Sequence, residues 1–257
     1  MSEQREVRIS DYGTAYRENY GFEQVLVESR RKIILELLDK ILPRTVVEVG
    51  CGTELLLKQV LEKYSINSPI EQWVVVEANN EFAKSAEKAD FPSGIFRVVN
   101  GFAEDSVEAI LDQFKRGPDL VICSSLLHEV DNLTEIVIAL SNMLSPGAYL
   151  HANVPNALSL HRQLAVSMGL TQSEKDLGER NKLLQQARIF TMEELIAILE
   201  ERGFEIVETG GYFIKPFTHS QMDNIPFMNP ELLDGLFQLG RKLPEIAAEI
   251  YVNARKL

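Results

Sequence analysis

The chain contains a short run of β-branched residues that leads directly into a glycine-rich turn and then into a helical pattern. The run is Thr45–Val49, the turn is Gly50-Cys51-Gly52, and three leucines beginning at Leu55 open the helical pattern. Because glycine has no side chain, a ligand can approach the backbone of such a turn at the start of a helix. This stretch predicts a strand–turn–helix unit that presents its main chain to a bound molecule.

Apolar runs alternate with helical patterns along residues 45–155. Beyond the first run, strands are expected at Gln72–Glu77 and at residues 94–99, 119–123 and 148–154, with a helical pattern between successive strands. Strands that alternate with helices pair in parallel and need cover on both faces of the sheet. The pattern predicts an α/β fold with a Rossmann-like, doubly wound, mostly parallel sheet.

The second half of the chain interrupts this rhythm with two long segments. Thr191 and Glu194 are spaced as a capping box, which predicts that a helix begins there and that the core resumes. Segments of about 30 residues exceed the usual connection between core elements, so we expect both to be lids over a substrate. The expected organisation is an N-terminal helical segment at 1–44, a core at 45–155, a substrate cap at 156–190, a core continuation at 191–215, a second cap at 216–246 and a final strand at 247–257.

The charge balance of the chain is acidic. Its 257 residues include 38 acidic and 26 basic ones, and the net charge of −12 opposes nucleic-acid backbones and anionic membranes. No apolar stretch approaches the roughly 20 residues that span a bilayer, and the N-terminus lacks the apolar segment of a signal peptide. We therefore expect a cytoplasmic protein without nucleic-acid or membrane partners. Cys51 and Cys123 lack the spacing of a metal or redox pair, so buried thiols and no metal are expected.

Acidic residues end or follow several of the predicted strands, where open α/β sheets bind their ligands. Glu77 ends the second strand, where its carboxylate can accept both hydroxyls of a ribose, and Glu104 follows the third. Leu55 occupies the position of the third glycine that a dinucleotide fingerprint requires. The acids would repel an anionic cofactor but not a cationic sulfonium. These residues favour an adenosine ligand without a pyrophosphate.

The motif Glu48-Val49-Gly50-Cys51-Gly52-Thr53 resembles the first motif of class I S-adenosylmethionine-dependent methyltransferases. The resemblance covers residues 45–155 well and residues 191–209 and 249–255 more loosely. It implies a seven-stranded sheet whose last strand is antiparallel, and S-adenosyl-L-methionine as the cofactor. By resemblance, the cofactor contacts are Glu48, Gly50, Cys51, Gly52, Glu77, Ala78, Phe102, Ala103, Glu104, Ser124, Ser125 and Leu126.

Glu54 departs from this family pattern, since a third small residue usually stands there. A glutamate at this position would either crowd the methionine carboxylate or point outward and cap the next helix, and we expect the second. His128 follows the fourth strand and is the candidate catalytic base, because histidine accepts protons near neutral pH. The alternative for His128 is an ordinary polar residue at a helix start. The candidate substrate contacts are Tyr12, Tyr16, Asn153, Asn156, His161 and Arg162.

The expected activity is methylation of a small polar molecule, with oxygen as the acceptor atom. Arg180 and His219 in the cap segments, with Lys215 directly before the second one, suggest a polar or anionic acceptor. Short motifs at residues 154–162 and 211–216 are similar to bacterial methyltransferases of cell-surface sugar or natural-product pathways, which implies a sugar, phosphorylated or natural-product-like acceptor. An oligomer formed through cap helices is also considered. The alternatives are a non-catalytic module that binds the cofactor and a nicotinamide-dependent oxidoreductase, which the missing third glycine opposes.

Overall fold

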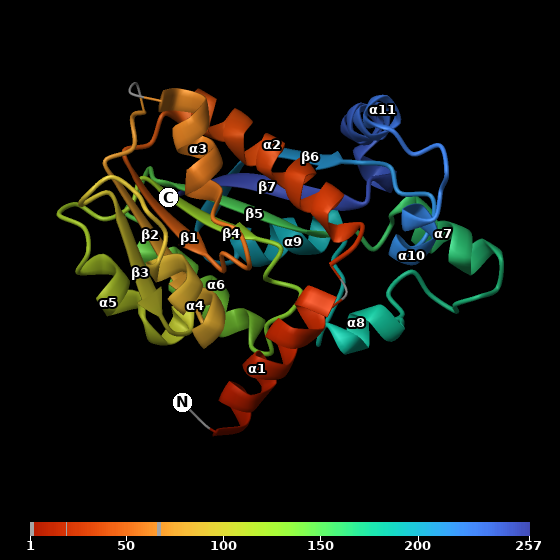
Figure 1. Ribbon diagram of the computed structural model, residues 1–257, viewed down its shortest axis with the longest axis horizontal. Coiled ribbons are helices and arrows are strands. Elements are labelled where there is room, and N and C mark those ends of the chain that lie inside the picture. The colour runs from red at the N-terminus through yellow and green to blue at the C-terminus, as the bar shows by residue number, and fades with distance from the viewer. Residues whose placement is uncertain (1–2, 19, 66–67) are drawn as a thin grey trace.

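Seven strands form one sheet in the order β3-β2-β1-β4-β5-β7-β6 (Figure 1). The computed structural model describes residues 3–18, 20–65 and 68–257. β7 runs antiparallel to both of its neighbours, and all other neighbouring strands pair in parallel. The strands are β1 (Thr45–Val49), β2 (Gln72–Glu77), β3 (Phe96–Asn100), β4 (Leu120–Ser124), β5 (Tyr149–Pro155), β6 (Phe204–Tyr212) and β7 (Glu249–Lys256). The predicted fold class, with an antiparallel last strand, is confirmed.

Some helices cover the two faces of this sheet, and others lie beyond the carboxyl edge of its parallel strands (Figure 1). They are α1 (Glu3–Glu18), α2 (Glu23–Ile41), α3 (Leu56–Tyr64), α4 (Asn80–Glu87), α5 (Val107–Leu111), α6 (Leu133–Met143), α7 (Leu160–Ser167), α8 (Glu179–Leu183), α9 (Met192–Glu200), α10 (His219–Asp223) and α11 (Pro230–Lys242), with short 3₁₀ turns η2 (Ala103–Asp105) and η3 (Pro244–Ile246). The sequence pattern predicts one helix over residues 104–114, and this is wrong. Ser106 leaves the helical conformation, with φ −119° and ψ 10°, and separates η2 from α5.

Neighbouring residues of each central strand enter opposite hydrophobic layers. On β1 and β2, Val46 and Trp73 pack with α2 and α3 on one face, while Val47 and Val74 pack with α6 and α9 on the other. This two-sided burial explains why the sequence shows continuous apolar runs instead of alternation. No helix among the described residues has both the length and the apolarity needed to cross a membrane. Cys51 and Cys123 are buried free thiols, as expected.

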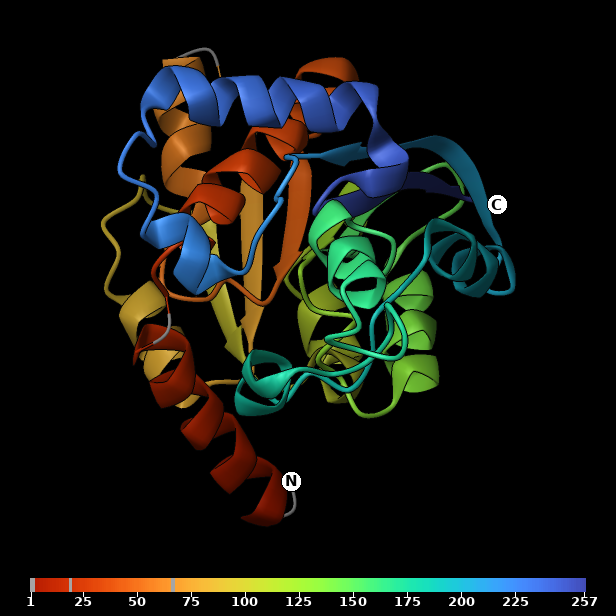
Figure 2. The same cartoon turned by 90° about the vertical axis from the view of Figure 1, so that its right-hand side faces the viewer.

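The elements outside the core gather at the carboxyl edge of the parallel strands. α1, α7, α8 and α10 lie beyond that edge, and α11 runs beside β6 (Figures 1 and 2). α11 approaches β6 very closely at Gly240, where a Cβ atom would lie 2.2 Å from the backbone nitrogen of Phe213.

The predicted helix start at Thr191 is also present. Thr191 and Glu194 form the reciprocal hydrogen bonds of a capping box at the start of α9.

Candidate cofactor and acceptor site

A cavity of about 610 Å³ opens at the carboxyl ends of β1, β2 and β4. α1, α7, α8 and α10 contribute to its walls. Asn153 does not line it. The predicted residues that do line it are Tyr12, Tyr16, Glu48, Gly50, Cys51, Gly52, Glu77, Ala78, Phe102, Ala103, Glu104, Ser124, Ser125, Leu126, His128, Asn156, His161 and Arg162.

The glycine turn after β1 forms the floor of one end of the cavity. Gly50 and Gly52 have φ angles of +79° and +61°, a left-handed conformation that disfavours other residues. The Gly50 nitrogen donates to the Val76 carbonyl at 2.8 Å, which ties the turn to β2. A Cβ atom on Gly52 would have no neighbour within 4 Å, so this glycine faces open space. The turn therefore presents its main chain to the cavity, as the sequence predicts.

Glu77 at the end of β2 holds the glycine turn by hydrogen bonds. Its Oε2 accepts from the backbone nitrogens of Cys51 at 3.0 Å and Gly52 at 3.4 Å, and its Oε1 accepts from Asn79 at 2.7 Å. Burial raises the pKa of this carboxyl, while the three amides oppose the shift. Sequence reasoning did not anticipate these bonds. Since a carboxylate offers about four acceptor positions, room for a ligand hydroxyl remains.

Glu48 lies beneath the turn and is only 6 % exposed. Its Oε2 accepts a hydrogen bond from the indole nitrogen of Trp73 at 2.9 Å. Burial raises the pKa of Glu48 to about 7. Glu48 thus lines the cavity with a carboxyl that is anchored in the core.

Glu54 points away from the turn and is held by α2. Its side chain is 54 % exposed, and its Oε2 accepts from Arg31 Nη1 at 3.0 Å. The expected outward orientation is therefore present. The expected capping role is wrong, because Leu55 occupies the N-cap position of α3 and no side chain caps that helix. Arg31 supplies the partner that the sequence did not reveal.

The loops after β3 and β4 close the two sides of the cavity floor. Gly101 donates its backbone N–H to the Glu77 carbonyl at 3.0 Å, which positions the following residues Phe102 and Ala103 against the end of β2. Ser125 has a φ angle of +55°, a strained conformation for a residue with a side chain. Leu126 lies within 4 Å of the Cβ position of Gly50.

Tyrosine rings from the N-terminal segment form a wall opposite the glycine turn. The ring centroids of Tyr12 and Tyr16 are 5.8 Å apart and stacked, and those of Tyr16 and Tyr20 are 5.4 Å apart. Tyr16 also packs edge-on against Phe82 of α4. This wall is apolar across the rings and polar at the hydroxyl groups. Burial raises the pKa of both Tyr12 and Tyr16, so their hydroxyls remain protonated.

His128 and Glu129 follow β4 and enter the cavity wall together. His128 is 1 % exposed, its Nδ1 has no partner among the described residues, and its Nε2 lies 3.6 Å from Glu129 Oε1. Burial lowers the pKa of His128 to about 3, whereas burial raises the pKa of Glu129 to about 8. Tyr12 is hydrogen-bonded to Glu129. Glu129 therefore titrates close to neutral pH, and His128 does not.

Two predicted asparagines have side-chain amide nitrogens that donate to other groups of the protein. Asn153 Nδ2 donates to Tyr212 Oη and Glu249 Oε2, both at 3.0 Å. Asn156 Nδ2 donates to two backbone carbonyls, and its Oδ1 accepts from the backbone nitrogen of Leu158 at 2.9 Å. Asn153 lies behind the cavity wall, and Asn156 shapes the chain where it leaves β5.

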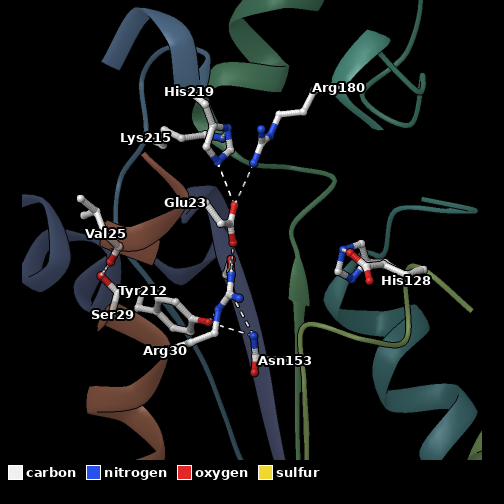
Figure 3. Close-up of polar contacts among 12 residues, drawn as sticks. Glu23, Val25, Ser29, Arg30, His128, Asn153, Arg180, Tyr212, Lys215 and His219 are labelled. Atoms are coloured by element: carbon white, nitrogen blue, oxygen red, sulfur yellow. Dashed lines mark hydrogen bonds and ion pairs between the residues drawn. The ribbon is translucent and has the colours of Figure 1, made fainter. Parts of the chain in front are cut away.

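Ion pairs link the start of α2 to the cap segments and to β7 (Figure 3). Arg30 Nη2 donates to Glu23 Oε1 at 2.8 Å and to Glu249 Oε1 at 2.5 Å. Glu23 Oε2 also accepts from His219 Nε2 at 3.2 Å and Arg180 Nη2 at 3.3 Å. These charges lie on residues far apart in the sequence, and sequence reasoning did not identify Glu23, Arg30 or Glu249.

Comparison with known proteins extends these observations. A family model described as a methyltransferase domain matches residues 22–209. The chain belongs to the class I S-adenosylmethionine-dependent methyltransferases. The predicted family and cofactor are confirmed. No curated protein sequence matches the chain significantly.

Solved structures share the fold of this methyltransferase. A methyltransferase described as S-adenosylmethionine-dependent, from Archaeoglobus fulgidus, is 19 % identical with a TM-score of 0.52, over 88 % of this chain and 94 % of the other. The plantazolicin methyltransferase BamL, solved with a desmethyl-plantazolicin analogue and S-adenosylhomocysteine, is 17 % identical with a TM-score of 0.58, over 98 % and 97 %. The N-methyltransferase NodS from Bradyrhizobium japonicum is 13 % identical with a TM-score of 0.53, over 96 % and 98 %.

The residues that line the cavity of this methyltransferase fit its cofactor. The open left-handed glycines leave room for a ligand against the turn, and the Glu77 carboxylate keeps acceptor capacity for a hydroxyl. The part of the cavity away from the glycine turn is lined by polar side chains. Among them, Glu129 is a functional candidate that the sequence analysis did not identify. The available signal was an acid directly after the predicted base at the end of a central strand.

Proposed function

We propose that the methyltransferase transfers a methyl group from S-adenosylmethionine to a hydroxyl oxygen of a small polar molecule. The glycine turn and Glu77 hold the cofactor, with the loop around Phe102, Ala103 and Glu104 at the adenine end. The acceptor lies between the tyrosine wall and the residues that follow β4. The cofactor, when bound, supplies an electrophilic methyl group on a positively charged sulfur.

The observation that carries this proposal is the half-buried Glu129 in the cavity wall. A hydroxyl is a weak nucleophile at neutral pH, so its proton must leave as the new oxygen–carbon bond forms and the sulfur–carbon bond breaks. Glu129, with a pKa of about 8, matches the pH at which a general base works best. It takes the hydroxyl proton on its carboxylate. The predicted base, His128, remains the alternative, but its pKa of about 3 makes it a weaker proton acceptor.

The remaining acceleration comes from position and from the exclusion of water. Methyl transfer is an in-line displacement, and holding the two reactants in line removes much of its entropic barrier. Stacked Tyr12 and Tyr16 offer a flat surface on which a sugar ring or a planar acceptor can rest. α8 and α10 border the same cavity and restrict its access to solvent.

The test combines binding with product analysis. Calorimetric titration should show binding of S-adenosylmethionine and no binding of NAD. Incubation of a metabolite pool with cofactor deuterated in its methyl group should yield a product heavier by one labelled methyl group, found by mass spectrometry. The Glu129→Gln variant should bind the cofactor and form little of that product. Binding without any S-adenosylhomocysteine formation by the wild type would favour a non-catalytic module.

A further inference from the structure

Lys215 is a buried cation without a carboxylate partner. It follows β6 and is 5 % exposed, yet it lines the cavity. Its ammonium nitrogen lies 3.2 Å from His219 Nδ1, the one hydrogen-bond partner found for it within the described residues (Figure 3). A buried ammonium is costly unless it is paired, and an imidazole satisfies only one of its three donors.

The nearby acids are paired with other groups and only partly offset the effect of burial on Lys215. Glu23 is occupied by Arg30, Arg180 and His219, and Glu249 is occupied by Arg30. Within residues 3–18, 20–65 and 68–257, no ion pair at 4 Å or less includes Lys215. Its charge therefore faces the cavity.

Arg162 of α7 brings a second cation to the same part of the cavity. Its Nη1 donates to the carbonyls of Glu174 at 2.8 Å and Asp176 at 3.1 Å, and its Nη2 to Asn181 Oδ1 at 3.3 Å. These neutral acceptors orient the guanidinium without neutralising it. The Asp176 carboxylate, which also lines the cavity, accepts from the backbone nitrogens of residues 172 and 173.

His161 contributes an unused polar atom to the same cavity. Its Nδ1 is buried and has no partner among the described residues. Burial lowers the pKa of His161, and the charges of Lys215 and Arg162 lower it further. Burial also lowers the pKa of Lys215 to about 7, with a further contribution from the charge of Arg162. These mutual effects mean that the three groups, which all line the cavity, are electrostatic neighbours.

We propose that Lys215, Arg162 and His161 form an oxyanion subsite in the acceptor half of the cavity, and that the methyl acceptor carries a carboxylate or phosphate there. An oxyanion would supply the missing counter-charge, and the ammonium and guanidinium groups would give it charge-assisted hydrogen bonds. Neutral His161 would donate one more. The claim that this oxyanion belongs to the methyl acceptor rests on the proposed function, whereas the anion site itself does not.

The test measures anion binding with the cofactor site filled. Inorganic phosphate and acetate are titrated calorimetrically into protein saturated with S-adenosylhomocysteine, so that the methionine-carboxylate position is blocked. Lys215→Met should weaken binding of the preferred anion at least tenfold. The matched control is Lys182→Met, since Lys182 is an exposed lysine of α8 that does not line the cavity. Phosphate and acetate together show which oxyanion the subsite takes.

The outcomes separate this proposal from the proposed function. Equal anion affinity of the wild type and Lys215→Met, or no anion binding by the wild type, would overturn the subsite. Binding of S-adenosylhomocysteine, measured first, reports on the cofactor site alone. A thermal melt shows whether Lys215→Met is folded, and His161→Gln provides a second variant that should also weaken the anion. If the wild type binds anions but transfers no methyl group, the subsite stands and the acceptor chemistry fails.

Discussion

Arg31 holds Glu54 at two points, through its side-chain Oε2 at 3.0 Å and its backbone carbonyl at 2.7 Å. The guanidinium comes from α2 and is largely buried, whereas the glutamate side chain is half-exposed. The bond to the carbonyl fixes the chain directly after the glycine turn, and it does not depend on which side chain stands at position 54. The unusual glutamate is therefore a secondary partner of an arginine that organises the turn.

Substitutions at these two positions should have unequal effects on cofactor binding. Glu54→Gly should leave the affinity for S-adenosylhomocysteine within a few-fold of the wild type, because the carbonyl contact persists. Arg31→Ala removes charge-assisted bonds and should weaken the affinity about tenfold or more. Calorimetric titration measures both. A large gain in affinity for Glu54→Gly would mean that the glutamate crowds the ligand.

Glu77 should be needed for cofactor binding beyond any contact with a ribose. Glu77→Gln replaces one acceptor oxygen by an amide donor, so at least one of the backbone N–H groups of Cys51, Gly52 or Asn79 loses its partner. We expect the variant to bind S-adenosylhomocysteine at least about tenfold more weakly than the wild type. Glu81→Gln on α4 is a control, because Glu81 is exposed and pairs with Arg17 outside the cavity lining. Unchanged binding by Glu77→Gln would remove Glu77 from the site.

The pH dependence of turnover should identify the base. With Glu129 as the base, kcat/KM rises as pH rises through about 8, since the carboxylate must be ionised to accept the proton. Glu129→Gln should lower turnover ~100-fold and abolish this rise, while the affinity for the cofactor stays within a few-fold. His128→Asn should retain the rise. The opposite pattern, with turnover lost in His128→Asn and kept in Glu129→Gln, would assign the base to His128.

His128 should make the protein less stable in mild acid. In the unfolded chain it takes up a proton below about pH 6.5, whereas its folded-state pKa is lowered to about 3, so its contribution falls as pH falls between these values. From pH 6.5 to 5 the loss amounts to about 2 kcal/mol. The raised pKa values of Glu48 and Glu129 act in the opposite direction, because these carboxyls protonate first in the folded state.

A comparison with His128→Asn isolates this effect from the carboxyls. The free energy of unfolding is measured by urea titration at about pH 7 and about pH 5. The value at about pH 5 minus the value at about pH 7 should be more positive for the variant than for the wild type, by about 2 kcal/mol. An identical pH dependence in both proteins would show that the pKa of His128 is not lowered in the folded state.

Two glycines of α11 should respond oppositely to the same substitution. Gly240→Ala places a methyl group about where the Phe213 backbone now lies, so α11 must move, and we expect a loss of about 1–3 kcal/mol. Gly235→Ala meets nothing within 4 Å and should stabilise the helix by about 0.5–1 kcal/mol. Thermal melts of the two variants compare them directly. Equal effects would mean that the close approach of α11 to β6 is not maintained.

The strands near the glycine turn could be predicted because their signal is local. Thr45–Val49 and Gln72–Glu77 are observed with the predicted bounds, since buried parallel strands require unbroken apolar runs between polar turns. The helix predicted over residues 104–114 failed because Ser106 interrupts a pattern whose apolar spacing continues past it. Local patterns do not report where such an interruption falls.

The acceptor half could not be predicted in the same way, because its contacts join distant parts of the chain. Glu129 acquires its shifted pKa from burial beside Tyr12, which belongs to α1. Lys215 and His219 could be recognised as polar residues of a cap, but their lack of a carboxylate partner depends on how Arg30 occupies Glu23 and Glu249. Those pairings exist only in the folded protein.

The position of β7 imposes an order on assembly. β7 follows every other strand in the chain, yet it lies between β5 and β6, which bond to it and not to each other. Strands added in the order of synthesis would leave β5 with an open edge and β6 detached until the end. Arg30 would meanwhile lack Glu249, its partner 219 positions away. The ion pair beside the cavity is therefore incomplete until β7 is in place, and a chain halted before β7 would expose the edge of β5 to association with other chains.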